Sequence, residues 1–232
     1  KSNTTPFFKI DKISLIYLLI IIFIQIIKQD SILIENYYST FFYKFSSEIS
    51  LYIFGTFTFS LGDILYLTLP LLLWYILKKE NTRRKNLKNI FQFIATLYIL
   101  FNFQWGLNYY RIPLEEKLLI KKKYELSSLI KVTELFINNT NSIHKRISNS
   151  DTLPVILNHK INKELFLESI ESIKRLKKEN ITNGYPFKIS IKKSLFSTPL
   201  SYMGFNGYIN PFTLEAQINT NTPELYLPTT IS

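Results

Sequence analysis

The chain contains no cysteine and few of the residues on which metal and phosphate sites are usually built. Without cysteine it forms no disulfide and no thiolate metal site, and it has no cysteine nucleophile. It has six glycines, and these form neither a glycine-rich phosphate loop nor the G-x-S-x-G elbow of the α/β-hydrolases. The sequence therefore contains no motif of these nucleotide-binding or hydrolytic classes.

Histidine is also scarce, with only His144 and His159 in the chain. Neither has a carboxylate at the spacing of a metal-ligand pair, so we interpret both as surface residues and a zinc site as the less favoured alternative. The sequence names no catalytic residue and no metal ligand.

Positive charge is abundant, with 28 Lys and Arg against 17 Asp and Glu, a formal net charge of +11. The basic residues are scattered or lie beside hydrophobic runs, where they act as signals of membrane topology. This distribution argues against nucleic acid as a partner and in favour of the lipid bilayer.

Three long hydrophobic runs occupy the first half of the chain and predict transmembrane helices at about 13–27, 61–77 and 90–105. The uncharged stretch between Lys88 and Arg111 would be about 33 Å long as a helix, enough to cross a hydrocarbon core of roughly 30 Å. The alternatives are a cleaved signal peptide for the first run and a buried helix of a soluble core for the third. No small-residue cleavage site follows the first run, so we favour a retained anchor.

The second run begins with a capping signal. Ser60 followed by Asp63 is the pattern in which a hydroxyl and a carboxylate satisfy the free amides at a helix start. We interpret Asp63 as a cap near the surface, with a buried functional carboxylate as the alternative. Pro70, within the run, is tolerated in a membrane span.

A connector rich in aromatic residues, 35–59, separates the first two runs. So many rings among few charges fit a segment that lies along the membrane interface. A packed subdomain outside the membrane is an equally open interpretation.

Charge asymmetry predicts the orientation. The link KKENTRRKNLK, between the second and third runs, carries six basic residues against one acidic residue, so we place it in the cytoplasm. The N-terminus is then cytoplasmic and everything after Arg111 is extracytoplasmic. Further basic residues shortly after Arg111 point the other way, but long domains are translocated largely regardless of charge.

Residues 112–232 predict an extracytoplasmic α+β domain. An amphipathic helix is expected at about 125–147 and a second at about 163–179, because apolar residues recur every three or four positions. The basic cluster 174–178 fits a solvated helix face, with anionic head groups as a minor alternative partner. In 187–192 the period changes to two, which predicts a half-buried strand with Ile191 inside and Lys192 outside.

The stretch 201–219 is dense in Gly, Asn and aromatic residues and holds one acid, Glu215. Its glycines allow close approach of the backbone, and its polar side chains could line a groove. A turn-rich hairpin whose Asn and Gly serve backbone geometry explains the same composition. The final residues follow an extended segment without a polar tail, and the domain offers a thin core, so we expect the sequence to be the front part of a longer protein.

The succession FNFQWGLNYYRIPL, YELSSLIKVTELFINNTN and SYMGFNGYINPFTLEAQINTNTPELYLPTTIS resembles a bacterial membrane family, domain of unknown function 3810, over about 35–232. The most specific part is the G-x-x-G-x-x-x-P-F-T-x-E-A run, which begins at Gly204 and ends at Ala216. The resemblance implies three spans followed by the N-terminal part of a zincin-like domain. It also implies an H-E-x-x-H zinc helix just after Ser232, so zinc is expected in a full-length protein and not in these residues.

Because an edge strand commonly lines the cleft of a zinc protease, the resemblance makes Glu215, Gln217 and Asn219 candidates for cleft-lining groups. The leading hypothesis is a multi-pass inner-membrane protein that carries the front of a zinc metallopeptidase-like domain, with a peptide or cell-envelope substrate. The alternative is a non-enzymatic envelope protein that binds a partner or a cell-wall component. A transporter is disfavoured, because three spans with almost no intramembrane charge offer no pathway.

Overall fold

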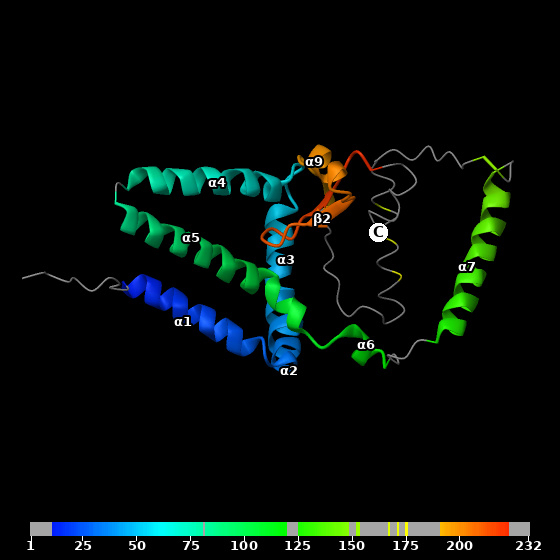
Figure 1. Ribbon diagram of the computed structural model, residues 1–232, viewed down its shortest axis with the longest axis horizontal. Coiled ribbons are helices and arrows are strands. Elements are labelled where there is room, and N and C mark those ends of the chain that lie inside the picture. The colour runs from blue at the N-terminus through cyan, green and yellow to red at the C-terminus, as the bar shows by residue number, and fades with distance from the viewer. Residues whose placement is uncertain are drawn as a thin grey trace, which may run out of the picture.

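The computed structural model describes residues 11–80, 82–119, 125–148, 152–153, 167, 171, 175 and 191–222. Within these residues the fold is mostly helical, with a small three-stranded sheet. Figure 1 shows three long helices side by side, a helical segment that crosses one end of them, and the sheet near that same end. The expected order, with helices first and an α+β part behind them, is confirmed at this level.

The three long helices are α1 (Lys12–Ile27), α4 (Leu61–Lys79) and α5 (Arg83–Gln104), and α5 contacts both of the others. Each predicted hydrophobic run is therefore a helix. Helix α5 begins earlier than predicted, because the Arg, Lys and Leu residues before the apolar run are good helix formers and extend it.

Length and hydropathy single out fewer membrane spans than the sequence predicts. Among the described helices, Leu61–Lys79 alone is long and apolar enough to cross a membrane. Only 11% of its most apolar stretch is buried, whereas the core helix of a soluble protein is mostly buried. Lys12–Ile27 passes only together with Ser31–Phe54, from which it is bent by 95°. One or two candidate spans thus indicate association with a membrane.

Helix α5 carries more polar residues than the other two, and two of them, Gln92 and Thr96, bond to its neighbour α1. The Nε2 of Gln92 donates to the Oγ of Ser14 at 3.2 Å, and the hydroxyls of Thr96 and Tyr17 share a hydrogen bond of 2.8 Å. In apolar surroundings such contacts join helices. Gln92 and Thr96 are therefore paired within the three-helix layer.

The aromatic connector is helical. Most of residues 35–59 lie in the π-helix η1 (Ile34–Phe42) and in α3 (Tyr43–Phe54), which follow the short helix α2 (Ser31–Leu33). Large side chains at helical spacing form an exposed stripe along it: Tyr37, Phe41, Phe45, Ile49 and Tyr52. This stripe faces away from the protein, as the interfacial interpretation requires.

The opposite face of the connector packs on the end of α5. The Tyr38 hydroxyl donates to the carbonyls of Asn102 (3.2 Å) and Phe103 (3.0 Å), which lie in the last turn of α5. The Arg111 guanidinium donates to both oxygens of Glu35, at 2.8 and 2.9 Å. The connector is thereby fixed across the end of the layer (Figure 1).

Beyond the layer, the short 3-10 helix η2 (Gly106–Tyr110) and helix α6 (Leu114–Lys117) lead to α7 (Leu126–Ile147). The first predicted amphipathic helix is thus confirmed, and none of its residues is buried in the described part of the chain. The predicted helix 163–179 lies outside the described residues, except for three helical positions at 167, 171 and 175.

The sheet has the strand order β1-β3-β2. Strand β1 (Ile191–Lys193) pairs in parallel with β3 (Ala216–Ile218), and β2 (Gly207–Ile209) pairs with β3 in antiparallel fashion. The short helix α9 (Ser197–Tyr202) connects β1 to β2. Most of the predicted strand 187–192 lies outside the described residues, while the turn and extended piece expected in 201–219 are present as β2, a turn and β3.

Candidate functional site

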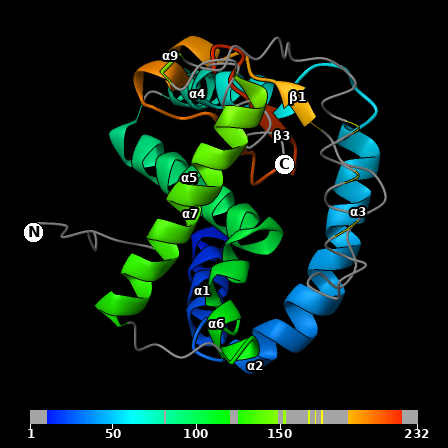
Figure 2. The same cartoon turned by 90° about the vertical axis from the view of Figure 1, so that its right-hand side faces the viewer.

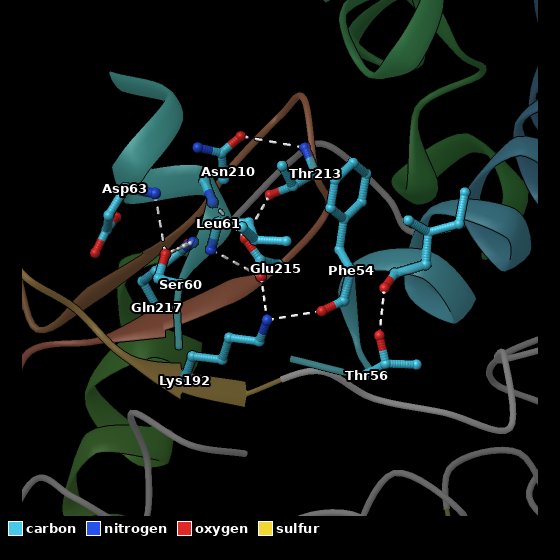
Figure 3. A network of polar contacts seen from close by, with 12 residues as sticks. Phe54, Thr56, Ser60, Leu61, Asp63, Lys192, Asn210, Thr213, Glu215 and Gln217 are labelled. Carbon is cyan, nitrogen blue, oxygen red and sulfur yellow. Dashed lines mark hydrogen bonds and ion pairs between the residues drawn. The ribbon is translucent and has the colours of Figure 1, made fainter. Parts of the chain in front are cut away.

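The sheet meets the helical layer at the first turn of α4, where a helix has free backbone amides. Ser60 is the N-cap, and its Oγ accepts from the amide of Asp63 at 3.0 Å, as the capping signal predicts. The carboxylate of Glu215 accepts from the amides of Leu61 (3.3 Å) and Gly62 (2.5 Å). A carboxylate more than 150 positions away thus completes the cap, and its charge suits the positive end of the helix (Figure 3).

Glu215 also forms a buried ion pair with Lys192. The carboxylate is 0% exposed and the lysine 5%. The ammonium group of Lys192 donates to Glu215 and, at 2.7 Å, to the carbonyl of Phe54 at the end of α3. The Thr213 hydroxyl donates to the same carboxylate at 2.9 Å. This cluster joins the sheet, the end of α3 and the start of α4 (Figure 3).

The prediction that Lys192 lies on the solvent face of its strand is wrong. Its side chain is buried, because a carboxylate and a carbonyl inside the protein accept hydrogen bonds from its ammonium group. The register explains the arrangement: Lys192 and Tyr208 both pair with Gln217 on the central strand. The three side chains therefore share one face of the sheet, and Gln217 and Tyr208 bond to the first turn of α4 from it.

The interpretation of Asp63 as a surface cap is also wrong. The carboxylate is 0% exposed and accepts from the Leu195 amide at 2.7 Å, from the Ser194 hydroxyl at 3.2 Å and from the Tyr208 hydroxyl. Burial, and then this hydrogen bond to Asp63, raise the pKa of Tyr208 above its ordinary value. Asp63 is therefore a buried carboxylate that ties both edge segments of the sheet to α4.

Close packing explains a glycine at this junction. A Cβ on Gly62 would lie 2.6 Å from the Nδ2 of Asn210 and 2.8 Å from the Oγ1 of Thr213. Asn210 in turn shapes the β2–β3 turn, because its Oδ1 accepts from the amides of Phe212 (2.9 Å) and Thr213 (3.2 Å). The turn includes Leu214 in the left-handed region, at a φ of 57°.

The three predicted cleft-lining residues alternate along β3 and its flanks, and all are buried: Glu215, Gln217 and Asn219. Glu215 binds the α4 amides, and the Nε2 of Gln217 donates to the Oγ of Ser60 at 2.9 Å. Asn219 lies apart from this cluster and donates to the carbonyl of Phe205 at 2.9 Å. The structure thus brings two of the three together, and their lining of a cleft stays a prediction.

Sequence reasoning missed Lys192, Tyr208 and Thr213 as members of the cluster. The only local signal was the cap at Ser60 and Asp63, which marks a helix start without naming its distant partners. Two buried atoms of the cluster have no hydrogen-bond partner within the described residues, the Oε1 of Gln217 and the Nδ2 of Asn210.

The described residues do not fit a zinc site. No three of their His, Asp and Glu side chains come close enough to hold a metal ion. The Nε2 of His144 lies 3.1 Å from the carbonyl of Leu153, and His159 lies outside the described residues. Two open pockets lie elsewhere, between α1 and α5 (about 320 Å³) and between α4 and α5 (about 410 Å³).

Comparison with known proteins gives one relationship. A search of curated proteins and a search of solved structures each find no match. The family model described as "Protein of unknown function (DUF3810)" matches residues 38–232, which contain α4, the sheet and every residue of the buried cluster. The chain therefore belongs to the DUF3810 family.

Proposed function

We propose that this chain is a multi-pass inner-membrane protein in which α1, α4 and α5 each cross the bilayer. In this proposal the sheet stands at the extracytoplasmic end of α4 as the front portion of a zinc metallopeptidase-like domain. The observation that carries the membrane part is the three-helix layer, which exposes apolar side chains outward and joins its polar side chains inward.

The dimensions of the layer suit a bilayer. The helices have 16, 19 and 22 residues, or about 24, 28 and 33 Å, against a hydrocarbon core of roughly 30 Å. Helix α5 is included although it fails on hydropathy, because Gln92 and Thr96 face α1 and not the lipid.

Charged contacts lie at the two ends of the layer. At one end Lys88 lies 3.8 Å from Asp11, which precedes α1, and at the other Arg111 binds Glu35. The first end includes the strongly basic link between α4 and α5, so the positive-inside rule supports a cytoplasmic position for it. The sheet, at the opposite end, is then extracytoplasmic.

The connector supports the same placement. It is bent by 95° from α1, and its exposed aromatic stripe would lie in the plane of the outer membrane interface. Aromatic rings are favoured at this depth.

The peptidase part of the proposal is supported by the resemblance carried by the run from Gly204 to Ala216. The described residues do not themselves fit a zinc site. The alternative is a non-enzymatic envelope protein whose outer domain binds a partner or a cell-wall component. One observation favours it: the side chains of Glu215 and Gln217 already form hydrogen bonds with the start of α4.

Two measurements test these statements. After alkaline carbonate extraction of membranes the protein should remain in the pellet, and release into the supernatant would contradict the spans. Metal analysis of the purified full-length protein should find zinc at about one ion per chain. If the full-length protein contains no zinc and hydrolyses no peptide, the peptidase proposal is contradicted and the non-enzymatic role is favoured.

A further inference from the structure

Five large apolar side chains are exposed in the segment between β1 and the β2–β3 turn. They are here called the α9 patch: Leu195 (61% exposed), Tyr202 (89%), Met203 (61%), Phe205 (55%) and Ile209 (51%). Such a concentration of large exposed side chains in a short segment is typical of an interaction surface.

The composition of the segment indicates the kind of surface it meets. From Ser194 to Leu214 the chain carries no charge, whereas at the overall share of 19% charged residues a run of this length would hold about four. A segment with exposed tyrosine and phenylalanine suits the lipid interface, where aromatic rings are favoured.

Contacts with α4 fix the depth of the patch. The Leu195 amide and the Ser194 hydroxyl donate to the carboxylate of Asp63, in the first turn of α4. If α4 spans the membrane, its first turn lies at the boundary between hydrocarbon and head groups. Helix α9 begins two residues after Leu195 and is about 9 Å long, comparable to a head-group layer of roughly 5–8 Å, so Leu195 and α9 lie at about the depth of that layer. Figure 2 shows α9 over this end of α4, with α3 on the other side of the molecule.

Buried contacts hold the exposed side chains in place. Leu200 is buried under α9, the Ser197 hydroxyl accepts from the Thr220 amide at 3.0 Å, and Asn219 donates to the carbonyl of Phe205 at 2.9 Å. The exposure of the patch is therefore a property of a fixed local structure. This also gives Asn219 a role, since it supports the loop that presents Phe205.

We infer that the α9 patch inserts into the outer head-group layer of the membrane, so that the sheet lies against the bilayer surface. The partner is a lipid surface. The inference rests on the proposed spans, because only a membrane-crossing α4 brings the patch to that depth. It goes beyond them, because it makes the extracytoplasmic domain a second point of membrane contact besides the aromatic connector.

Quenching by lipids tests the inference. The chain has two tryptophans, Trp74 and Trp105, and changing both to Phe allows a single tryptophan to be placed at will. Tyr202→Trp reports on the patch, and Leu71→Trp, exposed in the middle of α4, reports on the span. Asn138→Trp, on the polar side of α7, is the matched solvent control. Each variant of the full chain is reconstituted into phosphatidylethanolamine–phosphatidylglycerol vesicles with nitroxide lipids labelled near the carbonyl or near the chain end.

The tryptophan at 202 should be quenched at least twofold more by the shallow label than by the deep one, and the tryptophan at 71 should show the reverse. A tryptophan at 202 as unquenched as the α7 control, with the one at 71 still quenched, would overturn the inference and leave the spans intact. Emission that is blue-shifted but not quenched by either lipid would indicate a protein partner and would also overturn it. Absence of quenching at 71 would contradict the spans themselves and the inference with them.

Discussion

Replacing Glu215 by glutamine tests whether the buried cluster holds the sheet on α4. The glutamine keeps the size of the side chain and one oxygen for the α4 amides, but it removes the charge. Lys192, 5% exposed, would then have no counter-ion and would be left with neutral acceptors such as the Phe54 carbonyl. Removing one partner of a buried ion pair destabilises a protein by about 3–5 kcal/mol, and the favourable interaction with the helix N-terminus, about 0.3–1 kcal/mol, is weakened as well.

The assay is thermal unfolding of the purified protein in detergent. For a chain of this size the loss corresponds to a midpoint lower by roughly 6–20 °C. Lys193→Met is the matched control, since Lys193 is the exposed neighbour on the same strand and should change stability by no more than about 0.5 kcal/mol. The double variant Lys192→Met with Glu215→Gln removes both charges and should recover about 1 kcal/mol or more of the loss. A Glu215→Gln protein within about 0.5 kcal/mol of the parent would refute the reasoning.

Two further predictions concern other contacts. Gly62→Ala should lower the free energy of unfolding by about 1–3 kcal/mol, because the added Cβ would lie 2.6 Å from the Nδ2 of Asn210. This loss is expected although alanine favours helices. A thermal unfolding midpoint equal to or above that of the parent would show that the junction has room for the methyl group. Arg111 and then Lys117 lower the pKa of Glu35 to about 2, with burial opposing them. The stability from this group is therefore present above pH 4.5, its ordinary pKa, and is lost as the pH falls toward 2. Since both cations are partly exposed, the loss should be about 1–2 kcal/mol in urea titrations at pH 6 and pH 3, and Glu35→Gln should remove that share of the pH dependence.

Local patterns predicted the helices well. The three hydrophobic runs and the amphipathic stretch ending at Ile147 are all helices, because periodicity and chain length determine such elements locally. The cap at Ser60 was predicted for the same reason. What hydropathy alone could not indicate is that Gln92 and Thr96 of α5 face a neighbouring helix.

The buried cluster could be predicted only in part. Asp63 bonds to Ser194, 131 positions away, and no local pattern reveals such a partner. Lys192 was assigned to solvent because alternation of apolar and charged residues normally places the charged ones outside. It does not reveal a buried carboxylate that can pair with a lysine on the covered face of the strand. The family resemblance named Glu215 and Gln217 together as cleft-lining candidates, but it could not say that both side chains meet the start of α4.

The central claim is that the layer crosses the membrane with the sheet on the outer side, and the lack of cysteine makes it directly measurable. Single cysteines can be introduced at exposed positions as Thr82→Cys, in the α4–α5 link, and as Thr56→Cys and Thr220→Cys, at the sheet end. A membrane-impermeant maleimide should label the cysteines at 56 and 220 in intact spheroplasts and the one at 82 only after permeabilisation. Labelling of positions 82 and 220 from the same side of the membrane would contradict the account.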